Sequence, residues 1–372
     1  MPSRGCVGCG VRRGTDADDT LSDAISVRGR LGVCVIEAAE RCESDPSIER
    51  VAIDEMTFPL GVYPIEAMEP RQGYTLDFES ADGDEEHGEW EEWPDRYVYD
   101  IVVSAERLGP LVQSLLSLMP PRVFPILDVL GRDAYREIDP FISYDLMGLD
   151  QLYDGLIRYR PFFFEDGLVG FGAMAESPFF YVFVDEHKIT TVRAEAVLKE
   201  RIERILSAFD LVERDNPAGA DAVAHEHRGV LLTPPDDTSY LSFDEIVERL
   251  RDEWRLLLNV DPESNIDERG RDLGVTPWRC IVRVGDGSKH VRYSEVLLTA
   301  ASIRDAEDLA IDAVLTELSE IASGAEPLVV AADRLTAEGF RREVGETSDG
   351  LPRSALSTSR IFVRRWLDED PG

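Results

Sequence analysis

The order of apolar patterns in residues 96–212 restricts the fold more than any other feature of the sequence. Runs of apolar residues typical of strands alternate with stretches in which apolar residues recur every three or four positions, as on one face of a helix. In chain order they predict strand, helix, two strands, helix, three strands and helix, with Ser104 capping the first helix. Because several strands follow one another directly, we expect an α+β domain with a mostly antiparallel sheet and helices packed on one face.

A second α+β domain of the same kind is predicted for residues 241–345. It starts with a helix for which Ser242 and Glu245 form a capping box, and it continues with two strands around the turn GDGSK and with a further helix. Residues 213–240 contain Pro, Gly, Asp and Ala without periodicity, which is typical of a linker between domains. Residues 346–372 form a C-terminal tail, from which we expect an edge strand.

The N-terminal part is predicted to be less regular. Residues 1–30 are rich in Gly, Arg, Asp and Ser and are interpreted as a flexible leader. Residues 31–95 contain short strands and an acidic loop that lead into the first domain. Cys6 and Cys9 form a C-x-x-C pair, which has the shape of half a zinc knuckle. A closed zinc site needs two more ligands, so free thiols in the leader are the alternative.

The composition is strongly acidic, with a formal net charge of −35 at pH 7. A field of this sign repels phosphate groups and anionic lipids, so binding to nucleic acid or to a membrane is not expected. Salt adaptation, a nucleotide bias of the genome and docking of a protein with a basic surface are three explanations of the acidity. Residues 51–95 carry 14 acidic side chains and one basic side chain, and this uneven distribution favours local docking.

The most acidic segment is residues 79–95, which holds nine acidic side chains and no Lys or Arg. It is expected to be a solvated loop. Trp90 and Trp93 are unusual there, because solvated acidic tracts rarely contain such large apolar side chains. The two rings either fold back onto the domain or act as anchors for a partner protein.

Several classes of protein are disfavoured by what the sequence lacks. It has no apolar run of the about 18–20 residues that cross a membrane, and its first residues lack the apolar core of a signal peptide. Five cysteines, an odd number, favour reduced thiols over disulfides, so a cytoplasmic location is expected. The motifs of P-loop proteins, Rossmann domains, α/β-hydrolases and zincins are also absent.

A polar group made of Asp185, Glu186, His187 and Lys188 lies between two apolar strands. General acid–base catalysis needs an acid, a base and a cation brought together in this way. A tight hairpin turn exposed to water has the same composition, so the segment is interpreted either as a turn or as part of a catalytic site.

Two further patterns have the spacing of metal ligands. His225 and His227 would lie on one side of an extended segment, where they could hold a divalent metal, although they fall in the predicted linker. The second pattern resembles an EF-hand calcium loop but lacks the turn glycine and the final Glu of that motif, so a solvated acidic loop is the alternative. Its oxygen-bearing side chains are Asp261, Glu263, Asn265, Asp267 and Asp272.

The leading functional hypothesis is a non-catalytic protein-interaction or regulatory module that uses no cofactor and docks a basic protein through residues 79–95. The alternative is an enzyme of unrecognised type, such as a hydrolase assisted by a divalent metal. Its first catalytic candidates are residues 185–188, followed by His225 and His227. Neither hypothesis identifies a substrate, a partner or an oligomeric state.

Overall fold

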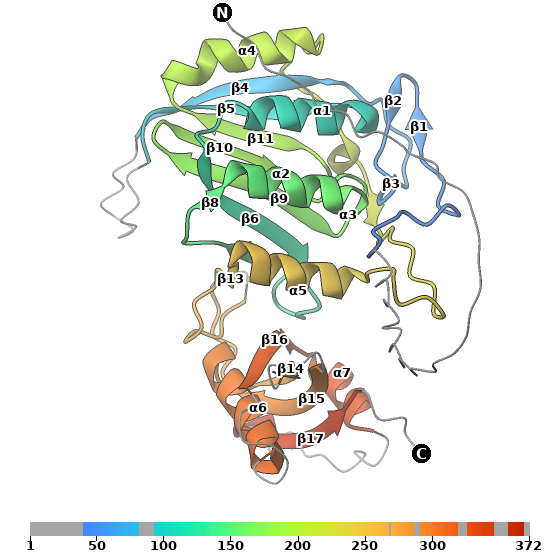
Figure 1. The fold of residues 1–372 in the computed structure, drawn as a ribbon, viewed down its shortest axis with the longest axis vertical. Helices are drawn as coiled ribbons and strands as arrows, with labels where there is room; N and C mark the ends of the chain where they lie inside the picture. Colours follow the sequence, from blue (N-terminus) through green and yellow to red (C-terminus); the bar gives the residue numbers. More distant parts are fainter. Residues whose placement is uncertain are drawn as a thin grey trace, which may run out of the picture. The chain divides into compact units, whose positions relative to one another are not determined.

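The computed structural model describes residues 40–81, 93–267, 269–285, 291–318, 326–345 and 356–367 (Figure 1). Within these ranges the elements are helices and antiparallel sheets, so the predicted α+β class is confirmed. In the same part of the chain, no helix combines the length and the apolar character needed to span a bilayer. The predicted leader at residues 1–30, together with Cys6, Cys9 and Trp90, lies outside the described residues.

A nine-stranded sheet dominates the first part of the fold, with the order β13-β7-β6-β9-β10-β11-β5-β4 and with β8 paired to β6. Its strands are β4 (Gly73–Glu79), β5 (Arg96–Val102), β6 (Arg122–Leu130), β7 (Ile138–Ile142), β8 (Met147–Gly148), β9 (Val169–Glu176), β10 (Phe179–Val184), β11 (Thr190–Ala194) and β13 (Leu257–Leu258). Two small sheets accompany it, β1 (Ala52–Ile53) with β2 (Met56–Thr57) and β3 (Val62–Pro64) with β12 (His225–His227).

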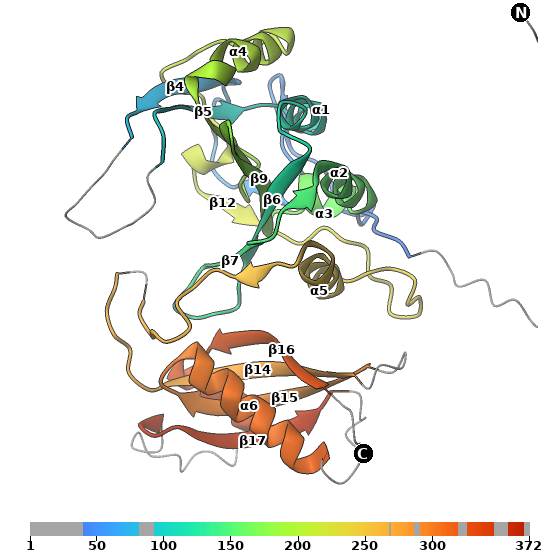
Figure 2. The ribbon, with the colours of Figure 1, turned by 60° about the vertical axis from the view of Figure 1, so that its left-hand side comes forward.

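Helices cover one face of the large sheet, as Figure 2 shows for α1, α2, α3 and α5. The helices of this part are α1 (Ala105–Leu116), α2 (Leu149–Arg158), α3 (Arg160–Phe164), α4 (Lys199–Ala208) and α5 (Phe243–Trp254), with the 3-10 helices η1 (Ala196–Leu198) and η2 (Ala220–Ala222). Leu108, Leu111 and Leu115 of α1 share one core with Phe163 and Phe171. Burying an apolar side chain of this size stabilises a fold by about 1.5–3 kcal/mol, so this face holds the first domain together.

Helix α5 belongs to this first core, whereas the sequence had placed it in the second domain. The capping box at its start is confirmed, because Ser242 Oγ accepts from the backbone N of Glu245 at 3.3 Å and the Glu245 carboxylate accepts from the backbone N of Ser242 at 2.8 Å. Leu250 and Trp254 pack into the core of the large sheet, where Trp254 stacks on Phe163 with 5.7 Å between ring centroids. Strand β13 follows and pairs with β7, so the first domain extends through β13.

Residues 213–240 are packed onto the first domain and do not form a free linker. Ala220 and Val230 are at most 1% exposed, and β12 within this segment pairs with β3. The backbone N of Ala218 also donates to the carbonyl of Arg71 at 3.0 Å. A segment that is held by such scattered contacts has no regular spacing of apolar residues. Its sequence therefore cannot be told from that of a free linker.

Ser104 occupies the N-cap position of α1, but its side chain makes no capping hydrogen bond. Its Oγ instead accepts from the backbone N of Thr57 at 3.0 Å and lies 2.7 Å from Thr57 Oγ1. The predicted position of the cap is therefore correct and its predicted hydrogen bond is wrong, because the hydroxyl ties β2 to the start of α1.

A four-stranded antiparallel sheet in the order β16-β14-β15-β17 forms the second domain. Its elements are β14 (Thr276–Gly285), β15 (Val291–Ala300), α6 (Ile303–Leu318), β16 (Glu326–Arg334), α7 (Ala337–Val344) and β17 (Arg360–Trp366). Helix α6 packs Ala306, Ala310 and Val314 into a core that contains Trp278. Strand β17 is the edge strand expected from the C-terminal tail, and the domain starts at β14 instead of residue 241.

A buried ion pair connects the loop after β6 with the end of β16. Nε of Arg334 lies 2.9 Å from Oδ1 of Asp133, and the two side chains are 5% and 0% exposed. The backbone N of Arg334 donates to the same carboxylate at 2.9 Å, and Nη1 of Arg334 donates to Asn265 Oδ1 at 3.2 Å. Both charges are thus paired and hydrogen-bonded, the condition under which buried ions are tolerated.

Trp254→Ala tests the assignment of α5, because it removes a ring that is 3% exposed and stacks on Phe163. We expect the free energy of unfolding to fall by about 3–5 kcal/mol, measured by urea denaturation of the full chain. Leu257→Ala is the control, since Leu257 is 59% exposed, and it should change this energy by less than about 0.5 kcal/mol. Equal small effects of both substitutions would show that α5 is not part of the first core.

Candidate metal centre

His187 is positioned by the tight turn between β10 and β11, which confirms the hairpin turn expected there. The backbone N of Asp185 donates to the carbonyl of Ile189 at 3.0 Å, and Oδ1 of Asp185 accepts from the backbone N of Ile189 at 2.7 Å. Lys188 has a φ of 65°, a left-handed conformation that is uncommon for a residue with a side chain. These contacts fix the backbone on both sides of His187.

His225 and His227 are positioned by β12, in which His225 lies opposite Pro64 of β3. Alternate residues of a strand face opposite sides, so the two imidazoles share a side, as the spacing predicted. Glu226 lies between them, and its side chain is 59% exposed and pairs with Arg228 at 3.5 Å. Only the two histidines are therefore directed toward the turn that carries His187.

Strand β12 is held in place by a close contact between two backbone segments that no short sequence pattern marks. The carbonyl of Gly61 accepts from the backbone N of Arg228 at 2.9 Å, and the backbone N of Gly167 donates to the carbonyl of Arg228 at 3.1 Å. A Cβ on Gly61 would lie 2.1 Å from the backbone N of Gly167, and a Cβ on Gly167 would lie 2.0 Å from the carbonyl oxygen of Gly61. Both positions therefore require glycine for steric reasons, although neither glycine belongs to a recognisable motif.

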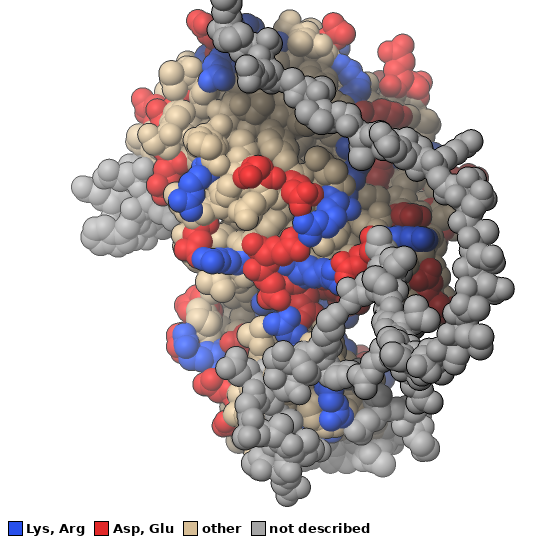
Figure 3. All heavy atoms as spheres, viewed as in Figure 1, with Lys and Arg blue, Asp and Glu red and all other residues tan. Residues whose placement is uncertain are grey.

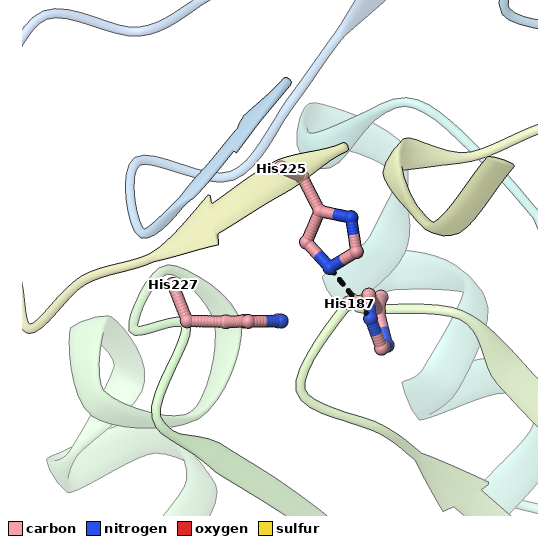
Figure 4. Close-up of side chains that lie close together, drawn as sticks. All are labelled: His187, His225 and His227. Atoms are coloured by element: carbon pink, nitrogen blue, oxygen red, sulfur yellow. Dashed lines mark hydrogen bonds between the residues drawn. The ribbon is translucent and has the colours of Figure 1, made fainter. Parts of the chain in front are cut away.

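The three imidazoles converge (Figure 4). Their ring centroids are 4.7 Å apart for His187 and His225, 4.8 Å for His187 and His227, and 5.0 Å for His225 and His227. Nε2 of His187 lies 3.0 Å from Nε2 of His225, and one nitrogen from each ring lies within 4.8 Å of the others. The structure thus joins two candidate groups that are far apart in the sequence.

Hydrogen bonds on the outer edges of two rings orient their inner nitrogens. Nδ1 of His225 donates to the carbonyl of Val223 at 2.8 Å, which leaves the Nε2 lone pair directed at the cluster. Nδ1 of His187 lies 3.3 Å from Asp185 Oδ2 and 3.4 Å from Glu186 Oε1. Because both carboxylates contact Nδ1, they orient the ring of His187 and leave its Nε2 directed at His225.

Charge and burial act differently on the rings. Burial, followed by the charges of His187 and His225, lowers the pKa of His227 to about 4, so this ring stays neutral at pH 7. Burial also acts to lower the pKa of His187, but Asp185, then Glu186 and Asp221, outweigh it and raise that pKa above its ordinary value. Acidic side chains thus favour positive charge at His187, whether it is a proton or a bound cation.

The cluster fits a transition metal ion. Zinc–imidazole bonds of about 2.0–2.1 Å at tetrahedral angles place ligand nitrogens about 3.3 Å apart, close to the 3.0 Å between the Nε2 atoms of His187 and His225. Nδ1 of His227 is buried and has no hydrogen-bond partner among the described residues, so this nitrogen is available as a ligand. Within the described ranges, this group contains three side chains that could act as ligands, and a second group, formed by Asp185, Glu186 and His187, shares His187 with it.

Lys188 is adjacent in sequence but does not join the cluster. Its side chain is buried, with the residue 3% exposed, and Nζ donates to the carbonyl of Val169 in the core. Burial lowers the pKa of Lys188 to about 8, and the nearby charge of Asp166 partly offsets this effect. The amino group of Lys188 is therefore bound to the core backbone instead of the histidine cluster, although the sequence made it a catalytic candidate.

The predicted calcium loop does not gather its oxygen atoms around one point. Asp267 accepts from the side chain of Arg271 at 2.5 Å, Asp261 accepts from the backbone N of Glu263 at 3.0 Å, and Asp272 accepts from the backbone N of Gly274 at 2.8 Å. Two further members are paired elsewhere, Glu263 with Arg304 and Asn265 with Thr276 and Arg334. The carboxylates of this loop are not among the groups of potential ligands within the described chain.

Trp93 folds back onto the first domain. Its ring packs edge-to-face on Phe179 with 4.8 Å between centroids, and the Arg96 guanidinium lies 5.6 Å from the ring centroid of Trp93. Arg96 also pairs with Glu79 at 2.7 Å, so this end of the acidic segment is anchored to β4 and β5. Of the two alternatives for the tryptophans, packing back onto the domain therefore describes Trp93.

Comparisons of the chain with protein-family models, with curated proteins and with solved structures find no match.

Gly61→Ala tests whether the glycine contact holds the site together. The added methyl group would meet backbone atoms that cannot move aside, so we expect the free energy of unfolding to fall by about 3 kcal/mol, the upper end of the usual cost of overpacking. Gly285→Ala is the matched control, because a Cβ there meets no described atom within 4 Å. Chemical denaturation of both variants makes the comparison, and an unchanged stability of Gly61→Ala would disprove the close contact.

Proposed function

We propose that the protein is a metal-dependent hydrolase whose centre holds a zinc ion on His187, His225 and His227. The observation that carries this proposal is the convergence of three imidazoles, with no fourth side-chain ligand in the same group among the described residues. Structural zinc sites are usually closed by four protein ligands, whereas catalytic sites keep three and leave one position for water or substrate. Three-histidine sets are found among the catalytic sites.

Zinc is preferred over calcium and magnesium because imidazole nitrogen suits zinc and its neighbours among the transition metals, while calcium and magnesium select oxygen ligands. The charge of the surroundings supports a cation. Asp185, Glu186 and Asp221 all act on His187 in the direction that favours positive charge. A formal net charge of −35 adds a general attraction for cations.

When bound, zinc supplies a Lewis acid and lowers the pKa of a coordinated water to about 7. The protein's own residues provide orientation. Val223 fixes the ring of His225, and Asp185 and Glu186 hold Nδ1 of His187, so that the Nε2 atoms of both rings face the centre. Carboxylate or carbonyl partners of this kind also raise the basicity of a ligating imidazole.

The docking function expected from the acidic segment receives less support than the metal centre. Trp93, one of its two anchor candidates, packs on Phe179. Residues 82–92, which include Trp90, lie outside the described residues, so docking remains a hypothesis based on charge.

Zinc affinity is the first test. We expect wild-type protein, stripped with a chelator and titrated against a chromogenic competitor, to bind one zinc ion. His225→Ala should weaken binding by more than the about 10–100-fold that follows loss of an outer hydrogen-bond partner, and Glu186→Gln should weaken it within that range. Glu226→Gln is the matched control, since Glu226 lies between two ligands but faces away, and it should leave the affinity unchanged.

Zinc binding by the His225→Ala variant with wild-type affinity, with circular dichroism confirming that it is folded, would refute the assignment of ligands. A loss of affinity in Glu226→Gln equal to that in His225→Ala would also refute it, because it would point to general damage to β12.

Hydrolysis is the second test. The zinc-loaded protein should cleave p-nitrophenyl acetate or bis(p-nitrophenyl) phosphate, lose this activity with the chelator and regain it with added zinc. The Glu226→Gln variant should retain the activity, and His225→Ala should lose it. Tight zinc binding without hydrolysis of either probe would retain the metal centre and overturn the hydrolase assignment.

A further inference from the structure

A cavity of about 430 Å³ lies between α5, strands β6 and β7, and the second sheet. This volume falls within the about 300–1,000 Å³ of typical small-molecule sites, which also favour the junction of two structural units. Its apolar wall includes Phe141, Val247, Ile281 and Val329. None of the cavity residues belongs to the histidine cluster, so this site is independent of the proposed hydrolase.

Asp333 of β16 lines this cavity, and its side chain has no direct polar partner among the described residues. The residue is only 6% exposed, and among the described residues its carboxylate makes no hydrogen bond and no ion pair. Burial, then the charges of Asp139 and Asp133, raises the pKa of Asp333 to about 6, and the charges of Arg136 and Arg279 partly offset this rise. An isolated buried carboxylate is costly unless a partner compensates it.

The other charges of the wall are largely used within the protein. Asp139 pairs with Arg136 at 2.5 Å. Arg279 pairs with Glu295 at 2.5 Å, and Glu248 pairs with Arg283 at 2.6 Å. The charges of Arg136 and Arg279 act on Asp333 and lower its pKa, but within the described chain neither guanidinium forms a hydrogen bond or an ion pair with it.

Arg251 and Glu307 also line the cavity, and within the described chain they form no ion pair with each other. Arg251 donates to the carbonyl of Val330 at 2.5 Å and lies over the ring of Phe141, while Glu307 is subject to its positive charge. The charge of Arg251 therefore acts on Glu307, whereas the arginines that act on Asp333 are Arg136 and Arg279. The balance of the cavity is acidic, with six carboxyl and four guanidinium side chains around it.

We propose that this cavity binds a small organic cation, a primary amine on an apolar body, with its ammonium group on Asp333. The ammonium group supplies the charged donor that the carboxylate lacks, and the apolar body covers Val247, Ile281 and Val329. A ligand placed there contacts α5 and β16 at once, and therefore links the first domain with the second.

Phenethylamine is the probe, compared with the neutral 2-phenylethanol and the anionic 3-phenylpropionate by isothermal titration calorimetry on the full wild-type chain. We expect saturable one-to-one binding of the amine and at least about tenfold weaker binding of the alcohol, because a charge-assisted hydrogen bond is lost. The anion should not bind. Equal affinity for amine and alcohol, or no binding of the amine, would overturn the proposal without use of any variant.

The substitution Asp333→Asn tests whether the carboxylate of Asp333 binds the ammonium group. It keeps the size of the side chain and removes an unpaired buried charge, so the variant should fold, and it should bind phenethylamine at least about tenfold more weakly. Asp244→Asn is the matched control, because Asp244 also lines the cavity but is exposed and pairs with Arg132 at 3.1 Å. Ala331→Leu should block the cavity and weaken binding of both the amine and the alcohol. Unchanged amine binding by Asp333→Asn would refute the role of this residue.

Discussion

The position of the histidine cluster depends on a backbone contact that only glycine permits. Gly61 and Gly167 approach so closely that a Cβ on either residue would overlap the backbone of the other. Arg228, next to His227, bridges the two through its own N and carbonyl. Glu165 reinforces this contact, since its carbonyl accepts from Gly61 and its carboxylate pairs with Arg50 at 2.7 Å. Without this junction, β12 would have no fixed relation to the turn that carries His187.

The acidity of the chain is compatible with a well-packed fold because arginine neutralises carboxylates where they are crowded. Figure 3 shows basic and acidic side chains interleaved across the region of α5. There, Arg158 contacts both Asp154 and Glu253, and Arg283 contacts Glu248 and Asp252. The planar guanidinium, with its five donors, can bridge two acids in this way, whereas the ammonium of lysine is a compact charge. Pairs this exposed add little stability individually, but they limit repulsion between neighbouring carboxylates.

Local sequence patterns predicted the elements and part of the site well. The capping box at Ser242, the turn at residues 185–188 and the common side of His225 and His227 each depend on a few neighbouring residues, and all are present in the structure. The joining of His187 to His225 was not predictable in this way. It depends on the register of β12 against β3 and on the Gly61–Gly167 contact, which involve segments that no short-range pattern connects.

The assignment of α5 failed for a related reason. An amphipathic helix shows which of its faces is buried but not which sheet it covers, and Trp254 could pack against either one. The linker at residues 213–240 was misread because irregular backbone and free backbone have the same composition. In each case the missing information was a tertiary contact and not a property of the segment itself.

The contact between His187 and His225 has a further consequence for the chain as a polymer. The two residues are separated by 38 positions, and the segment between them includes β11 and α4. An ion held by both would close this segment into a loop, as a disulfide does, and would restrict the unfolded chain. For a loop of this length the chain-entropy relation gives about 4 kcal/mol. A centre suited to chemistry would thus also act as a reversible cross-link in the first domain.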